Sequence, residues 1–379
     1  MVERAPEFRG GGQNVDVRGV GREVLARMGL EDAAIDRSTR EEGTAWIDER
    51  GEIAAQFLTS ELEGDGPTAE LEILRGDLAQ LLYDTSAERA RYRFGDWIEA
   101  VVQQDAGVEV HFASGASGRY DLVVVAEGVG SSTRELVFAG ENDPRWLNVT
   151  LAYFTIPRVP DDDLLWRWYH TTGGRGISLR PDPHGTTRAM LSVHKEPEGE
   201  QEWSVERKKA WLREQFHDAG WQAKRVLAGM ETTDDFYFDV LRQVRLPRWS
   251  KDRIVLLGDA AWCVTPLGGV GATLALTGGY VLASELARTD DVAQAASAYE
   301  TQMRPMVEDV QGIPKIVPRM ANPHSRLGLK LLHGVLKIAS LPAFRDAASK
   351  LFARPLKEPD LSRYDATAVS QSELESTRA

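Results

Sequence analysis

The stretch from Ile254 to Leu286 restricts the fold most, because it combines a buried strand, a glycine-rich turn and a helix in direct succession. The apolar run ending at Leu257 predicts a strand that delivers Gly258 and Asp259 at its carboxyl end, where open α/β sheets bind ligands. Pro266 and the cluster Gly268-Gly269-Val270-Gly271 then open a helix predicted over 272–287. Glycines at a helix N-terminus let backbone N–H groups approach an anion or a polarised carbonyl. A tight turn without a ligand is the alternative, and the complete pattern favours a ligand site.

Composition narrows the class of protein. A chain of 379 residues is longer than one that usually folds around a single hydrophobic core. We therefore expect two domains, continuous or discontinuous in sequence. The formal net charge of −13 argues against nucleic acid as a partner, because proteins bind the phosphate backbone through clustered basic residues. Cys263 is the single cysteine, which excludes an internal disulfide and fits a reducing, cytoplasmic location. The first residues do not resemble a signal peptide, and no run of about 18 apolar residues predicts a membrane-spanning helix.

Residues 1–140 alternate between helical and strand-like patterns. Helices are predicted near 22–28, ending at Gly29, and near 75–83. A strand is predicted at 53–58 and a hairpin across 97–112. The run 120–126 is continuously apolar, which is typical of a strand covered on both faces.

The pattern changes after residue 140. Aromatic and β-branched strands separated by Pro and Gly predict an antiparallel sheet, and one long helix is expected at about 205–219. These strands are 151–156, 164–169, 176–179 and 188–193. Helices are then predicted at 292–310 and 327–351, and the polar residues 370–379 are expected to be disordered.

The turn motif carries a family resemblance. Gly258-Asp259-Ala260-Ala261, followed by Thr265-Pro266 and Gly268-Gly269-Val270-Gly271, closely resembles the second FAD motif of the para-hydroxybenzoate hydroxylase superfamily, the class A FAD-dependent monooxygenases. The resemblance implies that Asp259 binds ribityl or ribose hydroxyls and that the amides of Gly269 to Ala272 face the flavin pyrimidine. Two positions depart from the family, with Trp262 replacing a histidine and Val270 a glutamine. The pattern looks closest to the branch near the tetracycline-inactivating and other antibiotic-modifying enzymes.

A second segment runs from the strand at 120–126 into Glu127-Gly128-Val129-Gly130. It half-matches a dinucleotide fingerprint, but Thr133 stands where a third glycine would be. It resembles the Asp-Gly motif of the same superfamily, which implies that Glu127 and Gly128 contact FAD. The alternative is a strand-to-helix turn in which glycine is needed only for a positive φ.

Three further residues gain meaning from the resemblance. Glu3 and Arg4 look like the Glu-Arg pair that binds the AMP half of FAD in this superfamily, and Arg75 matches an arginine on the flavin side of the cofactor. Taken alone, all three are ordinary surface residues. A complete site of this kind needs a strand and Gly-x-Gly-x-x-Gly about 20 residues before Glu3. We therefore expect a longer natural chain rather than a degenerate paralogue, and weak FAD binding without the upstream strand.

The sequence predicts an α/β protein with a Rossmann-like FAD-binding domain that lacks its first strand, an inserted antiparallel substrate domain and C-terminal helices. The predicted divisions are 1–140, 141–245, 246–290 and 291–379. The resemblance implies that NADPH or NADH reduces FAD, that O₂ forms a flavin C4a-hydroperoxide, and that an aromatic or polycyclic small molecule is hydroxylated. A flavoprotein reductase and an FAD-free paralogue are the alternatives. We assign no catalytic side chain, because the cofactor carries the chemistry.

Other features are less specific. Trp166 and Trp168 alternate onto one strand face, and together with Tyr169 they are candidates for a substrate pocket or for core packing. The seven histidines show no metal-ligand spacing, so no metal is predicted. The helix from Leu327 to Ile338 either bridges the domains or lies on a membrane surface, without stable insertion. A monomer or a homodimer is expected.

Overall fold

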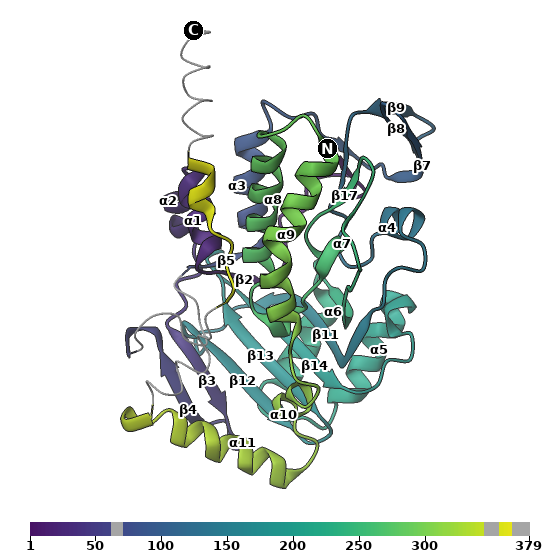
Figure 1. Cartoon of the computed structure of the whole chain (residues 1–379). Coiled ribbons are helices and arrows are strands. Elements are labelled where there is room, and N and C mark those ends of the chain that lie inside the picture. Colours follow the sequence, from purple (N-terminus) through teal and green to yellow (C-terminus); the bar gives the residue numbers. More distant parts are fainter. Residues whose placement is uncertain (62–70, 345–355, 366–379) are drawn as a thin grey trace.

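The computed structural model of the chain describes residues 1–61, 71–344 and 356–365. Figure 1 shows a group of helices on one side of the molecule and a large sheet on the other. The helical group contains α1 (Val20–Arg27), α3 (Arg75–Ser86), α8 (Gly271–Leu286) and α9 (Val292–Gln311). The α/β class predicted from the sequence is confirmed.

The large sheet has seven strands, and every neighbouring pair except one is antiparallel. In spatial order the strands are β15 (Tyr237–Gln243), β11 (Arg145–Pro157), β14 (Thr186–His194), β13 (Arg175–Pro181), β12 (Leu165–Thr171), β3 (Gly43–Ile47) and β4 (Ile53–Leu58). The four predicted strands after residue 150 are all present as β11 to β14. The aromatic and β-branched composition of these segments suits a pleated, half-buried surface.

Strands β3 and β4 come from the first part of the chain, yet they extend this sheet. The exceptional parallel pair joins β3 to β12, with Trp46 opposite Trp168. Residues 43–58 therefore belong structurally with the sheet of residues 141–245 and not with the predicted 1–140 unit, which is a correction to that division. Local alternation marks these residues as strands, but it carries no information about which distant strand they join. The remaining boundaries stay predictions.

Two helices cover one face of the sheet. The helix predicted at about 205–219 is present as α5 (Val205–Phe216), whereas the second helix, α6 (Ala223–Thr232), was not predicted. The chain turns between them at Trp221, a non-glycine residue with φ of +49°. Tyr169, Leu212, Phe216 and Met230 are buried in the layer between the helices and the sheet. The opposite face, which we call the inner face, carries Trp166 and Trp168 and is turned toward the helical group.

The helical half contains four small sheets among the described residues. They are β1 (Val2–Glu3) with β6 (Arg93–Phe94), β2 (Asn14–Val17) with β5 (Leu71–Leu74), β7 (Ile98–Gln104) with β8 (Gly107–Phe112) and β9 (Ser117–Tyr120), and β10 (Val123–Val125) with β17 (Ile254–Leu256) and β16 (Ser250–Lys251). The predicted hairpin is confirmed as β7–β8. The strand expected at 120–126 is shorter, and Val124 keeps 41% of its surface exposed. In the described part of the chain it is thus not covered on both faces.

The C-terminal part is helical, as predicted. After α9 come α10 (Val317–Ala321) and α11 (Arg326–Ala339), and α11 lies along the lower edge of the sheet in Figure 1. The helix predicted over 327–351 ends at Ala339, and residues 345–351 and 370–379 lie outside the described residues. Within the described ranges, no helix is both long and apolar enough to cross a membrane. The remaining short helices are α2 (Glu31–Asp36), α4 (Ser132–Val137) and α7 (Asp259–Trp262).

Candidate cofactor and substrate site

The turn between β17 and α8 has an open space beside its glycines. Gly258 and Gly269 adopt φ values of +62° and +70°, which other residues rarely adopt. A Cβ atom built at Gly258, Gly269 or Gly271 would meet no atom within 4 Å. Gly268 differs, because its Cβ would lie 2.8 Å from a methyl group of Val310 on α9. Three glycines thus border room for a ligand, whereas Gly268 permits close packing.

The N-terminus of α8 presents backbone amides to this space. Val270 is the N-cap residue and provides no side-chain hydrogen bond to the first turn. Its side chain is buried in the core, where the glutamine usual in the family would be costly to bury. The hydroxyl of Thr265, just before Pro266, is buried without a hydrogen-bond partner in the described part of the chain. These donors suit a carbonyl or an anion at the helix N-terminus.

Asp259 follows Gly258 directly and keeps an accessible side chain. Surrounding protein nevertheless displaces much of its water, and this desolvation raises the pKa of Asp259 above its usual range. The Asp239 carboxylate on β15 raises that pKa further, and a hydrogen bond with the Cys263 thiol opposes the shift. Among the described residues Asp259 has no salt bridge, so its carboxylate can accept hydrogen bonds from ligand hydroxyls.

An apolar cluster on the sheet adjoins the turn. Leu267 from the turn packs with Tyr153, Trp168 and Met190 of the inner face. Trp166 lies beside Trp168, with ring centroids 4.9 Å apart, as their alternation on one strand predicts. Tyr169 points the other way into the buried layer under α5 and α6, so it is a core residue. We call Tyr153, Trp166, Trp168, Met190 and Leu267 the aromatic wall.

Glu3 and Arg4 lie at the end of β1. Glu3 is exposed, and its Oε1 accepts a hydrogen bond of 2.7 Å from the amide of Ala5. The Arg4 guanidinium donates to the hydroxyl of Ser132 at 3.1 Å and lies over the Trp97 ring at 5.5 Å. Since Ser132 begins α4, the structure brings the predicted Glu-Arg pair next to the second predicted segment.

The turn at Glu127 and Gly128 is well ordered by its own contacts. Glu127 accepts hydrogen bonds from the Ser131 hydroxyl at 2.7 Å and from the amide and hydroxyl of Thr133 at 3.0 and 2.6 Å. Gly128 has φ of +79° and open space at its Cβ position. These contacts are those of a residue that caps the N-terminus of α4. They fit the alternative in which this segment is a strand-to-helix turn without a ligand. Its contact with FAD stays a prediction.

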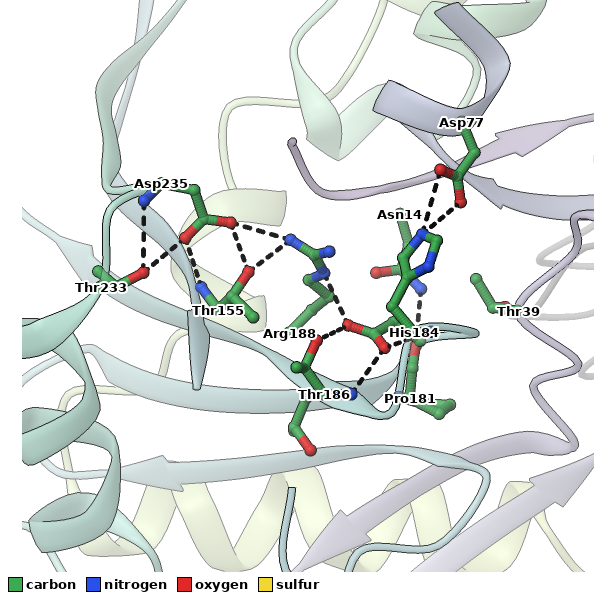
Figure 2. Close-up of polar contacts among 12 residues, drawn as sticks. Asn14, Thr39, Asp77, Thr155, Pro181, His184, Thr186, Arg188, Thr233 and Asp235 are labelled. Atoms are coloured by element: carbon green, nitrogen blue, oxygen red, sulfur yellow. Dashed lines mark hydrogen bonds and ion pairs between the residues drawn. The ribbon is translucent and has the colours of Figure 1, made fainter. Parts of the chain in front are cut away.

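Arg75 begins α3 and is exposed, next to a run of three glycines. A Cβ built at Gly12 would lie 2.8 Å from Arg75 Nε, and one at Gly76 would clash with the carbonyl of Gly10. The glycine run therefore passes against the start of α3 at a distance that only glycine permits. The His184 ring bonds Asp77 of α3 through Nε2 at 3.0 Å, as Figure 2 shows.

A polar cluster links the ends of β11 and β14 near the glycine run. Arg188 donates to Asp182 at 3.0 Å, to Asp235 at 2.9 Å and to the Thr155 hydroxyl at 2.5 Å. Figure 2 shows Arg188 reaching toward Asp235 and Thr155. Asp235 also borders the glycine run, since its Cβ is 3.6 Å from a Cβ built at Gly11. This cluster therefore lies beside the glycine run that contacts Arg75.

A second ionic cluster, not predicted from the sequence, is buried beneath the aromatic wall. Arg180 on β13 lies 3.8 Å from the centre of the Trp166 ring and bonds Glu41 Oε2 at 2.9 Å. It also pairs with Glu72 of β5, and Asp16 Oδ1 lies 3.9 Å away. One cation thus serves three carboxylates that come from separate parts of the chain. Their sequence separation hides the cluster from motif or periodicity analysis.

Glu72 is a buried acid of this cluster, with 3% of its surface exposed. Desolvation is the main cause that raises the pKa of Glu72 well above its usual value, and Glu41 and Asp16 add to it, while Arg180 opposes it. Asn14 Nδ2 donates a 2.5 Å hydrogen bond to Glu72 Oε1. The side chain therefore favours its protonated form compared with an exposed glutamate.

We expect Glu72→Gln to stabilise the protein at pH 8 by at least about 1 kcal/mol. Because the folded-state pKa of Glu72 is raised, folding favours the protonated side chain. This stabilisation is fully present below the unfolded-state pKa of about 4.3, and it is lost as pH rises through the folded-state pKa. The stabilisation of the variant should therefore vanish near pH 4. Urea unfolding at pH 4 and pH 8 measures the difference, and a variant less stable than wild type at pH 8 would contradict it.

Comparison with known proteins identifies the family of the chain. Residues 1–311 match the family model described as "FAD binding domain". The chain is 34% identical to the FAD-dependent monooxygenase asL6 of Sarocladium schorii over 363 residues, which cover 90% of this chain and 85% of that protein. It is also 34% identical to the flavin-dependent monooxygenase eupH of Phoma sp, over 90% of this chain and 86% of the relative.

Solved structures show the same arrangement. The tetracycline destructase Tet(51) superimposes with a TM-score of 0.75 at 30% sequence identity, covering 89% of each chain. HpxO of Klebsiella pneumoniae, solved with FAD and uric acid, has a TM-score of 0.74 over 93% of this chain and 89% of its own. Its identity is 20%, so it supports the fold alone.

Proposed function

This chain belongs to the FAD-binding-domain family and is an FAD-dependent monooxygenase, and on that premise we propose that it uses NADPH or NADH and O₂ to hydroxylate an aromatic or polycyclic small molecule. The observation that carries the substrate class is the aromatic wall, which adjoins the glycine-rich turn through Leu267. Apolar pockets with a few polar groups bind flat ligands by burial and stacking.

The residues of the turn fit FAD. Asp259 would accept hydrogen bonds from sugar or ribityl hydroxyls, and the amides from Gly269 to Ala272 would face a polarised carbonyl of the flavin. Arg75 would lie on the flavin side, and Glu3, Arg4 and the Gly128 turn would lie toward the adenosine. The open space at Gly258, Gly269 and Gly271 supports this placement, because any side chain there would occupy the cofactor's volume.

Bound FAD supplies hydride acceptance and oxygen activation, and the protein positions the substrate and excludes water. Tyr153 and Tyr237 lie near each other on the inner face, with ring centroids 6.4 Å apart. Burial is the main cause that raises the pKa of both phenols above their usual range. Both therefore stay protonated at neutral pH and can donate a hydrogen bond to a carbonyl or phenolate of the substrate.

The proposal is tested with a panel of phenolic and polyketide-like compounds on FAD-loaded protein. We expect slow NAD(P)H oxidation alone, acceleration by a cognate aromatic compound with matching oxygen uptake, and a product heavier by one oxygen atom. Acceleration without oxygen uptake would assign the protein to the reductases.

Trp168→Ala tests the aromatic wall directly. We expect the Kd of the cognate compound to rise roughly three- to tenfold, because a stacking partner contributes about 0.5–1.5 kcal/mol. Trp203→Ala is the matched control, since Trp203 is also half-buried but sits beside α5 under Arg207. Ligand-induced change in flavin absorbance measures Kd, and equal effects of the two variants would remove Trp168 from the substrate site.

A further inference from the structure

Helix α11 is apolar on two sides, and the sheet covers only one of them. Leu329 and Leu336 are buried, and Leu336 packs with Leu332 against Phe57 of β4 and Trp46 of β3. On the other side Leu327, Leu331, Val335 and Ile338 keep 77%, 67%, 56% and 55% of their surface exposed. Their spacing of four, four and three residues places them in one stripe along the helix. We call these four residues the outer stripe.

Exposed apolar residues also flank the helix in the sequence. Leu341 and Phe344, which follow α11, are 46% and 52% exposed, and Ile316 and Met320, which precede it, are 54% and 63% exposed. Scattered apolar residues on a surface need no explanation, whereas a contiguous series of this length marks an interaction site. The residues of α11 that face the sheet already stabilise the fold, so the outer stripe has no role in the packing of the described chain.

The charge of this segment is opposite to that of the protein. Residues 313–344 contain five of the 45 lysines and arginines and none of the 58 aspartates and glutamates. The five basic residues are Lys315, Arg319, Arg326, Lys330 and Lys337. The carboxylates that act on this helix, Asp48 and Glu49, belong to the β3–β4 turn and lie near His333, which is half-buried rather than in the outer stripe. In a chain of net charge −13, a segment of this kind is a local basic patch.

We propose that α11 is a peripheral membrane-binding element that lies flat on an anionic lipid surface. The outer stripe would enter the boundary between headgroups and acyl chains, and the basic residues would pair with anionic headgroups. The 14 residues of the helix span roughly 21 Å, and the sheet-facing leucines hold it in the orientation that exposes the stripe.

A second copy of the chain fits this surface less well. In a two-fold pairing of outer stripes, Lys330 and Lys337 of one copy would approach the same residues of the other. The segment offers no acidic residue to pair with them, so like charges would meet. An anionic bilayer supplies the missing negative charge.

Co-sedimentation of the full chain with vesicles tests the proposal. We expect binding to vesicles of phosphatidylcholine mixed with phosphatidylglycerol, little binding to phosphatidylcholine alone, and weakening with added salt. Leu331→Glu with Val335→Glu should reduce the bound fraction at least tenfold at equal lipid. Lys330→Gln with Lys337→Gln should reduce the preference for the anionic lipid. The control pair is Leu136→Glu with Val205→Glu, two residues of α4 and α5 that are 52% and 48% exposed.

Far-UV circular dichroism and melting temperature, unchanged in all variants, show that each protein is folded. The proposal is overturned if the chain does not bind anionic vesicles, or if the stripe variant binds them as well as wild type does. Concentration-dependent dimerisation that the stripe variant abolishes, without vesicle binding, would assign the surface to a second copy and overturn it also.

Discussion

Replacing Arg180 with leucine is expected to lower the free energy of unfolding by about 3–5 kcal/mol, because three carboxylates would lose their shared counter-charge in a buried setting. The guanidinium bonds Glu41 at 2.9 Å and pairs with Glu72, and it lies over the Trp166 ring. Leucine would fill part of the volume but could not satisfy the carboxylates. The loss should also loosen the contact between the inner face and β5, on which Glu72 lies.

Urea unfolding at pH 7 measures this effect, and Arg167→Leu is the matched control. Arg167 on the neighbouring strand β12 pairs with Asp163 at 2.6 Å in an accessible position, so its loss should cost less than about 1 kcal/mol. Adding Glu72→Gln to Arg180→Leu should recover part of the stability, because one uncompensated charge is removed. Equal losses for the Arg180 and Arg167 variants would show that the cluster is not a stabilising unit.

Replacing Asp259 with alanine is expected to weaken FAD binding tenfold or more, which corresponds to about 1.5–3 kcal/mol for hydrogen bonds to a charged acceptor. The fold should not suffer. Desolvation raises the folded-state pKa of Asp259, so its contribution to stability is complete at low pH and is lost as the carboxyl ionises. At pH 7 the alanine variant should be at least as stable as wild type.

Quenching of FAD fluorescence on titration with protein measures the affinity. Asp161→Ala, in the exposed turn after β11, removes a carboxylate of the same kind far from the glycine-rich turn and should leave FAD affinity unchanged. Unchanged affinity in the Asp259 variant would remove this residue from the cofactor site. A variant that loses both FAD and its melting transition would instead point to a role in folding.

Features set by local periodicity or turn chemistry could be predicted from the sequence. The β7–β8 hairpin, the strands β11 to β14 and helix α8 lie where alternation, glycine and apolar spacing indicate them. Trp166 and Trp168 share a face because side chains alternate along any strand. The turn at Trp221 and helix α6 after it were not predicted, because a positive φ at a tryptophan is uncommon and residue propensity does not indicate it.

The site was predictable as a motif but not as a set of contacts. Trp262, which replaces the family histidine, packs between Trp249 and Tyr299 in the core, with ring centroids 4.6 and 5.9 Å away. That position therefore has a packing role in this chain. Arg180 and its three carboxylates come from two sheets and the segment before β3, and only tertiary structure brings them together.

The parallel pairing of β3 with β12 has a consequence for engineering by recombination. About 120 residues separate the two strands, so the sheet that carries the aromatic wall cannot be completed until both distant segments are in place, which favours slow, non-local folding. A chimera that exchanges only 141–245 with a relative would pair a foreign β12 with the native β3, so Trp46 would face the relative's residue in place of Trp168. Residues 43–58 should therefore be exchanged together with strands β11 to β15. Crossover points inside the 1–140 region should not separate residues 43–58 from these strands.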